Sequence, residues 1–165
     1  MNYVNDTVRR QDRLLDEERA REILLSAEYG VLSMIDADGT PYGIPVNFVW
    51  DGADTFYIHT APEGYKLKAL ALHPAVSLCV VGHVALQPSL FTTEYESIIL
   101  RGTARVLTDE DEMLHALHMI VDKFSPNDKA LGYKYCLKSF HRVKVIRLDM
   151  TEYSGKRKRL HPVKP

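Results

Sequence analysis

Residues 29–60 have the sequence YGVLSMIDADGTPYGIPVNFVWDGADTFYIHT, and this stretch decides the fold. Its runs at 29–35, 42–50 and 55–60 are rich in Val, Ile, Tyr and Phe, a composition typical of β-strands. The connecting segments DADG and DGAD are compact turns that are too short to contain crossover helices. We therefore expect antiparallel strands in a meander, which favours a barrel or curled sheet over a parallel α/β sheet.

Two helices are predicted from capping residues followed by apolar periodicity. Asp16 can cap an amphipathic helix that runs to about Glu28. Thr108 can cap a second helix, whose first turn is acidic and which ends near Phe124 because Ser-Pro follows. The apolar stripe of this second helix is interpreted as core packing. The segment 127–140 has no decisive pattern.

The remaining strands complete a mainly β protein of the α+β class. They are expected at 76–81, at 97–107 and as a closing strand marked by Val143 and Val145, with Leu148 and Met150 as further candidate members. Because the chain has 165 residues and no linker-like tract, we expect one domain over 1–165, with flexible ends at about 1–12 and 157–165.

Composition excludes several classes of site and partner. Cys79 and Cys136 are far apart and form no C-x-x-C pair, so neither a disulfide framework nor a metal site is indicated. The net charge of -1 predicts no nucleic-acid partner, and the basic run at 156–159 is interpreted as a solvated, mobile terminus. No apolar stretch has the length of a membrane span or a secretory signal, so we expect a soluble, cytoplasmic protein without a membrane partner.

Residues 59–74, HTAPEGYKLKALALHP, form the stretch most suggestive of chemistry. A β-type run ends there, and a short helix follows Gly64. The first turn of a helix has unpaired N–H groups and a positive dipole end, so Gly64, Tyr65 and Lys66 can surround a phosphate, to which Lys66 adds a full charge. Such turn-to-helix junctions are also common in proteins that bind nothing there.

At this point the chain resembles the pyridoxamine 5′-phosphate oxidase-like FMN-binding split barrels, most closely their nitroimidazole-resistance branch. The local match consists of His59, Ala61, Gly64, Lys66, Leu70 and Pro74. Three further pieces match in order, at 45–47, 97–107 and 123–126, so the similarity extends over about residues 10–156. The resemblance implies an FMN-binding split β-barrel and a homodimer with FMN at the interface.

The resemblance also implies roles for individual residues. Pro45, Val46, Asn47 and Phe48 are expected beside the flavin ring and ribityl chain, and His59 and Thr60 at the ring or the ribityl chain. Gly64, Tyr65 and Lys66 are expected at the phosphate. Tyr95 and Ser97 are expected to approach FMN from the second subunit. A looser match places residues 153–156 over the ring. Each also has a purely structural interpretation: Asn47 as a strand-edge polar residue, Thr60 as a β-former, Tyr65 as a cover of the core and Ser97 as a solvent-facing strand residue.

The implied function is an FMN-dependent reductase. A flavin carries the electron chemistry itself, which agrees with the absence of a G-x-S-x-G or G-x-G-x-x-G motif. Such an enzyme would pass electrons from NADH or NADPH to a small acceptor such as a nitroaromatic. His59 is the candidate catalytic residue, either orienting the acceptor or donating a proton.

Other functions remain open. The same barrel could be a non-catalytic flavin- or haem-binding module, with His59 or another histidine as the axial ligand, or a structural dimerisation domain. Pyridoxamine 5′-phosphate oxidase activity itself is disfavoured, because the only tryptophan is Trp50 and the C-terminal segment lacks the Arg- and Trp-bearing signature of those enzymes.

Overall fold

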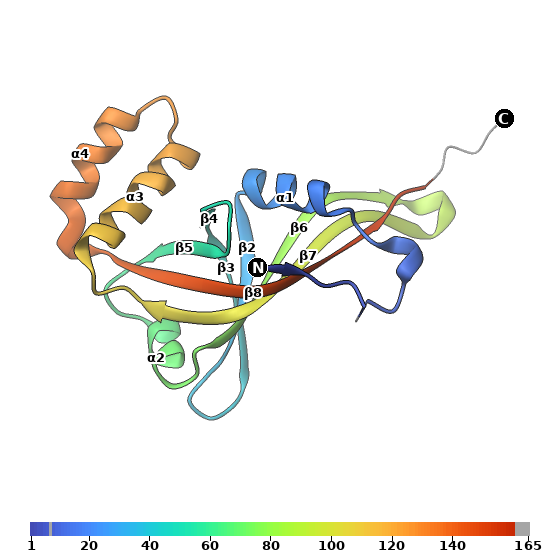
Figure 1. The fold of residues 1–165 in the computed structure, drawn as a ribbon, viewed down its shortest axis with the longest axis horizontal. Coiled ribbons are helices and arrows are strands. Elements are labelled where there is room, and N and C mark those ends of the chain that lie inside the picture. Colours follow the sequence, from blue (N-terminus) through green and yellow to red (C-terminus); the bar gives the residue numbers. More distant parts are fainter. Residues whose placement is uncertain (7, 161–165) are drawn as a thin grey trace.

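The computed structural model describes residues 1–6 and 8–160 and is built around one strongly curved, mostly antiparallel sheet (Figure 1). The order of the strands is β3-β2-β6-β7-β8-β5-β4, and β1 pairs in parallel with β8. The strands are β1 (Asn2–Tyr3), β2 (Tyr29–Ile35), β3 (Pro41–Asn47), β4 (Val49–Trp50), β5 (Thr55–Thr60), β6 (Ala75–Gln87), β7 (Thr92–Val106) and β8 (Lys144–Lys158).

Helices flank this sheet. They are α1 (Glu17–Ser26), α2 (Tyr65–Leu72), α3 (Glu110–Phe124) and α4 (Lys129–Ser139), with short 3-10 segments η1 (Gln11–Arg13), η2 (Pro88–Leu90) and η3 (Phe140–Arg142). Asp16 caps α1 as predicted, accepting from the N–H of Arg19 at 2.9 Å. The predicted cap of α3 was wrong by one residue: Asp109, not Thr108, accepts from the N–H of Glu112 at 2.8 Å. The undecided segment 127–140 is mostly α4.

The two edges of the sheet come from neighbouring residues of the chain. β3 and β4 lie at opposite ends of the strand order, yet only Phe48 separates them in sequence. The sheet must therefore curl until its edges approach, although it does not close into a continuous ladder. The predicted pairs β2–β3 and β4–β5 are present and antiparallel, but the predicted continuous strand 42–50 and its meander are interrupted at Phe48. This is the predicted split-barrel class, with the split between the edge strands β3 and β4, beside which β3 also approaches β5.

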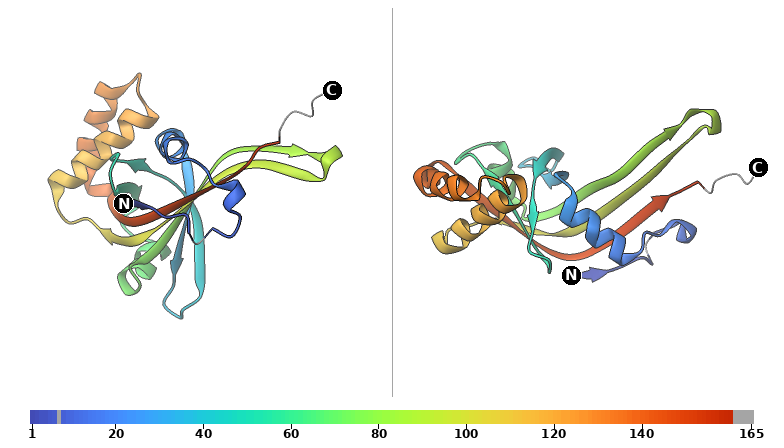
Figure 2. Two further views of the ribbon diagram at one scale, coloured as in Figure 1. Left: turned by 45° about the vertical axis from the view of Figure 1, so that its right-hand side comes forward. Right: turned by 90° about the horizontal axis from the view of Figure 1, so that it is seen from above.

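Strands β6, β7 and β8 are much longer than predicted. β6 and β7 extend beyond the barrel as a two-stranded arm (Figure 2). Their register shifts between Val81 and Val84, and beyond this bulge the side chains of β6 are exposed or only half-buried. Because neither face of the arm is buried against the core, packing imposes no strong apolar pattern on its sequence.

Two hydrophobic clusters stabilise the fold. The larger fills the curved sheet beneath α1, with Phe48, Phe56 and Tyr153 among its largest buried side chains. The smaller lies between the outer face of β5 and helices α3 and α4, and it includes Tyr57 and Met113. Within the described residues, every helix is too short or too polar to cross a bilayer.

The basic run at 156–159, expected to be a solvated terminus, lies instead at the end of β8. Arg157 pairs with Asp16 at 3.0 Å, and Arg159 pairs with Glu96 at 2.9 Å. Glu96 is 1% exposed, and Arg19 also contacts it at 2.8 Å, so these cations hold the pKa of its carboxyl at about 2. Residues 7 and 161–165, which belong to the expected flexible ends, lie outside the described residues.

Candidate functional site

The alternation of β5 divides its side chains between two environments. Ile58 belongs to the cluster inside the curved sheet, whereas Tyr57 belongs to the cluster under α3 and α4. Successive residues of a strand point to opposite faces, so Thr60 follows Ile58 and His59 follows Tyr57. The end of β5 thus presents a threonine to the barrel side and a histidine to the helix side.

A pocket of about 310 Å³ lies at the split of the barrel, between the edge of β3 and the end of β5. We call it the seam pocket. It brings together six of the predicted cofactor-binding residues, namely Pro45, Val46, Asn47, His59, Thr60 and Lys66. Ile58 and Ala61 complete its lining. Asn47 is held in place because its side-chain amide donates to the carbonyl of Glu28 at 2.8 Å.

Thr60 contributes a buried hydroxyl without a partner. The residue is 7% exposed, and its Oγ1 makes no hydrogen bond with any described residue. Leaving a buried hydroxyl unsatisfied costs about 1–3 kcal/mol. Because Thr60 lines the seam pocket, a ligand oxygen there could supply the missing partner.

The N-terminus of α2 adds positive charge beside this hydroxyl. Gly64 is the N-cap, with a φ of 150° that favours glycine, and no side chain caps the helix. Its first turn contains no acidic residue. The ammonium of Lys66, in that turn, forms no ion pair among the described residues. Unpaired N–H groups, the helix dipole and a free ammonium together form an anion-binding arrangement.

The electrostatics of His59 agree with this arrangement. Although His59 is exposed as a whole, desolvation of the imidazole and then the charge of Lys66 lower its pKa below the ordinary value of 6.5. Both causes favour the neutral form of the imidazole. An anion that neutralised Lys66 would remove the second cause and raise this pKa.

A family model for pyridoxamine 5′-phosphate oxidase matches residues 16–157 of this chain. The chain belongs to the pyridoxamine 5′-phosphate oxidase family. This confirms the family resemblance predicted from the sequence. No curated protein is significantly similar to the chain in sequence.

Solved structures with the same fold are numerous. A candidate 5-nitroimidazole antibiotic resistance protein from Bacteroides thetaiotaomicron has 25% identity and a TM-score of 0.70, over 87% of this chain and 85% of that one. The flavocytochrome Anf3 from Azotobacter vinelandii has 24% identity and a TM-score of 0.70, over 91% and 71%. The FAD and haem binding protein from Mycobacterium smegmatis has 22% identity and a TM-score of 0.72, over 91% and 75%.

The structure limits how three predicted residues of this pyridoxamine 5′-phosphate oxidase family member could contact a ligand. Phe48 is fully buried in the core, where the Nζ of Lys123 lies 4.4 Å from its ring centroid, so its side chain cannot reach a ligand. Tyr153 is 1% exposed and donates its hydroxyl to Glu17 at 2.8 Å, so it cannot cover a flavin ring. The hydroxyl of Tyr65 donates to Asp36 at 2.6 Å, which leaves the backbone N–H as the group that Tyr65 could offer to a phosphate.

Two predicted residues lie elsewhere in the protomer. Tyr95 and Ser97 are half-buried on β7 and do not line the seam pocket. Tyr95 pairs with Val84 on the arm, and the Nζ of Lys156 lies 5.8 Å from its ring centroid. Their expected approach from a second subunit stays a prediction.

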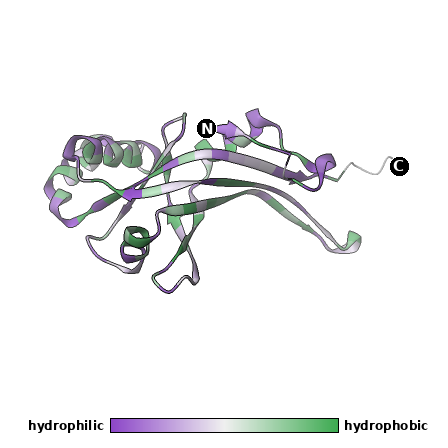
Figure 3. Cartoon of the chain, turned by 60° about the horizontal axis from the view of Figure 1, so that its bottom comes forward, coloured by the Kyte–Doolittle hydropathy of each residue, from purple (hydrophilic) through white to green (hydrophobic). Residues whose placement is uncertain are grey.

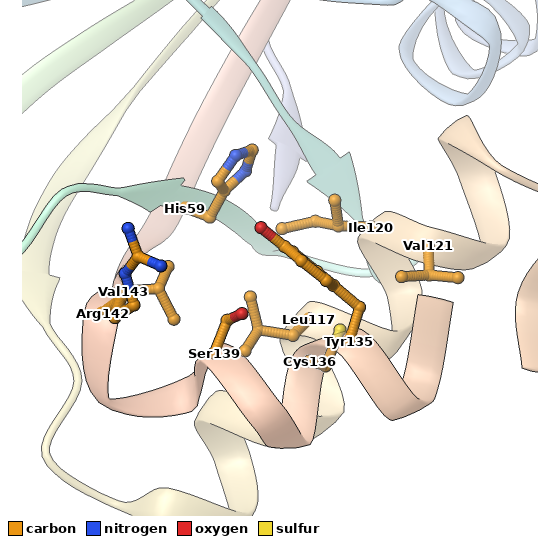
Figure 4. Close-up of a pocket in the computed structure, with 9 residues that line it drawn as sticks. All are labelled: His59, Leu117, Ile120, Val121, Tyr135, Cys136, Ser139, Arg142 and Val143. Atoms are coloured by element: carbon orange, nitrogen blue, oxygen red, sulfur yellow. The ribbon is translucent and has the colours of Figure 1, made fainter. Parts of the chain in front are cut away.

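A second pocket, of about 360 Å³, was not predicted from the sequence. It lies between β5 and the helices α3 and α4, and we call it the helix pocket (Figure 4). His59 lines both pockets. The residues Leu117, Ile120 and Val121 of α3, which we had interpreted only as core packing, form one wall. This pocket could not be predicted because its other wall is α4, whose sequence had no decisive pattern.

Proposed function

We propose that the seam pocket binds the phosphate end of FMN and that the protein is an FMN-dependent reductase. In this proposal, electrons pass from a reduced nicotinamide to a small acceptor such as a nitroaromatic. The observation that carries the proposal is the unpartnered hydroxyl of Thr60, which shares one pocket with the free ammonium of Lys66.

The groups around the seam pocket fit a phosphate. Thr60, which the resemblance assigned to the ring or ribityl chain, is here proposed to offer its hydroxyl to the phosphate. Lys66 offers an ammonium, and the first turn of α2 offers its backbone N–H groups. Among the described residues, no carboxylate side chain lines the pocket to repel an anion. Hydrogen bonds to charged acceptors are about twice as strong as neutral ones, so phosphate satisfies these donors better than a neutral ligand would.

The rest of the cofactor would extend along β3. Pro45, Val46 and Asn47 line the pocket on that side and are available to the ribityl chain and ring. When bound, FMN supplies the hydride and electron transfer chemistry. His59 stands between the two pockets, where it would orient the acceptor or hold a proton for it.

The similarity to a candidate nitroimidazole-resistance protein supports a nitroaromatic acceptor. The similarity to a flavocytochrome and to an FAD and haem binding protein supports a flavin cofactor. Because the names of these last two proteins include a cytochrome or haem, a haem-binding module is a second candidate function. The lowered pKa of His59 favours a neutral imidazole, the form that ligates iron. An absorption spectrum separates the two candidates, because haem gives a Soret band and flavin does not.

We further propose that the protein works as a homodimer with its sites at the interface. The tip of the arm is coloured as hydrophobic in Figure 3. The arm exposes apolar side chains that a second copy would bury, including Val84, Leu86 and Leu90, and Phe91 at the tip is 98% exposed. Tyr95 lies on the same arm and Ser97 at its base, which supports their predicted role towards the partner's FMN. A monomer that holds FMN tightly in light-scattering measurements would contradict this.

Substitution of Thr60 tests the cofactor site. We expect Thr60→Val to stabilise the unloaded protein by about 1 kcal/mol, because the unsatisfied hydroxyl is removed, and to weaken FMN binding by about 10-fold. Binding of riboflavin, which lacks the phosphate, should hardly change. Thr55→Val, at the other end of β5, is the control, because Thr55 is also buried but its hydroxyl donates to Asp54 at 3.4 Å. Equal losses for FMN and riboflavin would remove Thr60 from the phosphate site.

A further inference from the structure

The helix pocket adjoins the proposed cofactor site through a single residue. His59 lines both pockets, and its ring lies at the edge of the helix pocket, close to the end of the Tyr135 side chain (Figure 4). On the opposite side, Tyr135 of α4 directs its hydroxyl towards His59. A molecule in the helix pocket would thus contact two groups that can donate a hydrogen bond or a proton.

The walls of the helix pocket suit a flat apolar molecule. Leu117, Ile120 and Val121 supply aliphatic surface from α3, and the ring of Tyr135 supplies aromatic surface from α4. A volume of about 360 Å³ lies within the range usual for small-molecule sites.

One end of the helix pocket is cationic. Arg142, at the end of η3, lines the pocket and forms no ion pair with any described residue. Between Asp128 and Asp149 the chain has six Lys and Arg residues and no acidic residue. Only Lys129 and Arg147 of these six have ion-pair partners in the described part of the chain. Ser139, at the end of α4, adds a hydroxyl to the same lining.

We infer that the helix pocket binds the electron acceptor and selects aromatic molecules that carry a carboxylate. Arg142 and Ser139 bind the carboxylate, the α3 wall packs against the ring, and the reducible group faces His59 and Tyr135. This inference rests on the proposed reductase function, because that function places the acceptor beside His59. A planar guanidinium suits a carboxylate because it can donate two parallel hydrogen bonds.

Binding of two matched probes tests the selection. We would measure the affinity of the FMN-loaded protein for 4-nitrobenzoate and 4-nitrobenzamide by calorimetry, since these differ mainly in the charge of one substituent. We expect the carboxylate to bind about 10-fold more tightly, as for a charge-assisted hydrogen bond. Arg142→Gln should bring the two affinities together, whereas Lys138→Gln, an exposed position on α4 outside the pocket lining, should keep the preference.

A filled pocket provides the second arm of the experiment. Ser139→Phe places a ring in the helix pocket and should abolish binding of both probes while FMN affinity stays at its wild-type value. Equal affinities in the wild type, a preference that survives Arg142→Gln, or full binding by Ser139→Phe would each overturn the inference. Failure of the wild type to bind FMN in a separate titration would count against the proposed function instead.

Discussion

Helices α2 and α3 begin in opposite electrostatic environments. At α3, the carboxylate of Asp109 accepts from the N–H of Glu112, and three acidic residues occupy the first turn. At α2, the N-cap is Gly64, no side chain caps the helix, and the first turn contains Lys66 in place of an acid. Both helices have the same unpaired N–H groups and dipole at this end.

The difference shows which helix end is available to a ligand. The chain satisfies α3 with its own carboxylates, so that end has little attraction for an external anion. The end of α2 retains its positive potential, and the unpartnered hydroxyl of Thr60 lies in the pocket beside it. A stabilising cap and a binding site are thus alternative uses of the same backbone groups.

Converting the start of α2 into one like that of α3 should have the largest effect. Lys66→Glu removes the ammonium and adds a first-turn acid, so we expect FMN affinity to fall by more than the roughly 10- to 150-fold loss expected for Lys66→Ala. The unloaded protein should gain about 0.3–1 kcal/mol from the helix dipole. Lys68→Glu is the control, because it changes net charge equally from an exposed position outside the seam pocket. An equal loss of FMN in that control would show a general charge effect.

Removing His59 should separate turnover from cofactor retention. His59→Ala is expected to keep FMN and to reduce nitroaromatics more slowly, by about 10²-fold if the imidazole is a proton donor. Steady-state kinetics and the flavin spectrum measure the two properties, with exposed His141→Ala as the control. Unchanged turnover would make His59 a bystander, and loss of FMN would make it a cofactor anchor.

The opposite substitution at α3 should change stability alone. Asp109→Ala removes a side-chain cap, so we expect a loss of about 1 kcal/mol in the free energy of unfolding, measured by urea denaturation. FMN affinity should stay within error of the wild type, because Asp109 does not line the seam pocket. A clear loss of FMN would mean that the two helix ends are coupled.

The smallest expected effect is on the titration of His59, followed by NMR. Its pKa should lie below 6.5 and rise towards that value in Lys66→Ala or when inorganic phosphate is added. Because the folded-state pKa is lowered, the contribution of His59 to stability is present above about pH 6.5 and is lost as pH falls. An unperturbed pKa in the wild type would contradict the positive field assigned to α2.

Much of the fold and part of the site follow from local sequence. Strands β2 and β5 have the predicted bounds, because Asp- and Gly-rich turns define where each strand ends and these depend on neighbouring residues only. The start of α1 also follows from local sequence. Its cap, Asp16, accepts from the N–H of Arg19, which is only three residues away. The proximity of Gly64 and Lys66 to the end of β5 follows from the same short-range chemistry.

Only the tertiary structure decided what depends on contacts between distant segments. The break at Phe48 separates β3, which pairs with β2, from β4, which pairs with β5. Phe48 itself packs in the core instead of facing a ligand. Burial of the Thr60 hydroxyl, the bond from Tyr65 to Asp36 and the helix pocket between β5 and α4 are likewise set by how separate elements pack. Propensity and periodicity report a residue's neighbours along the chain, whereas burial and hydrogen-bond partners are determined by segments that meet only on folding.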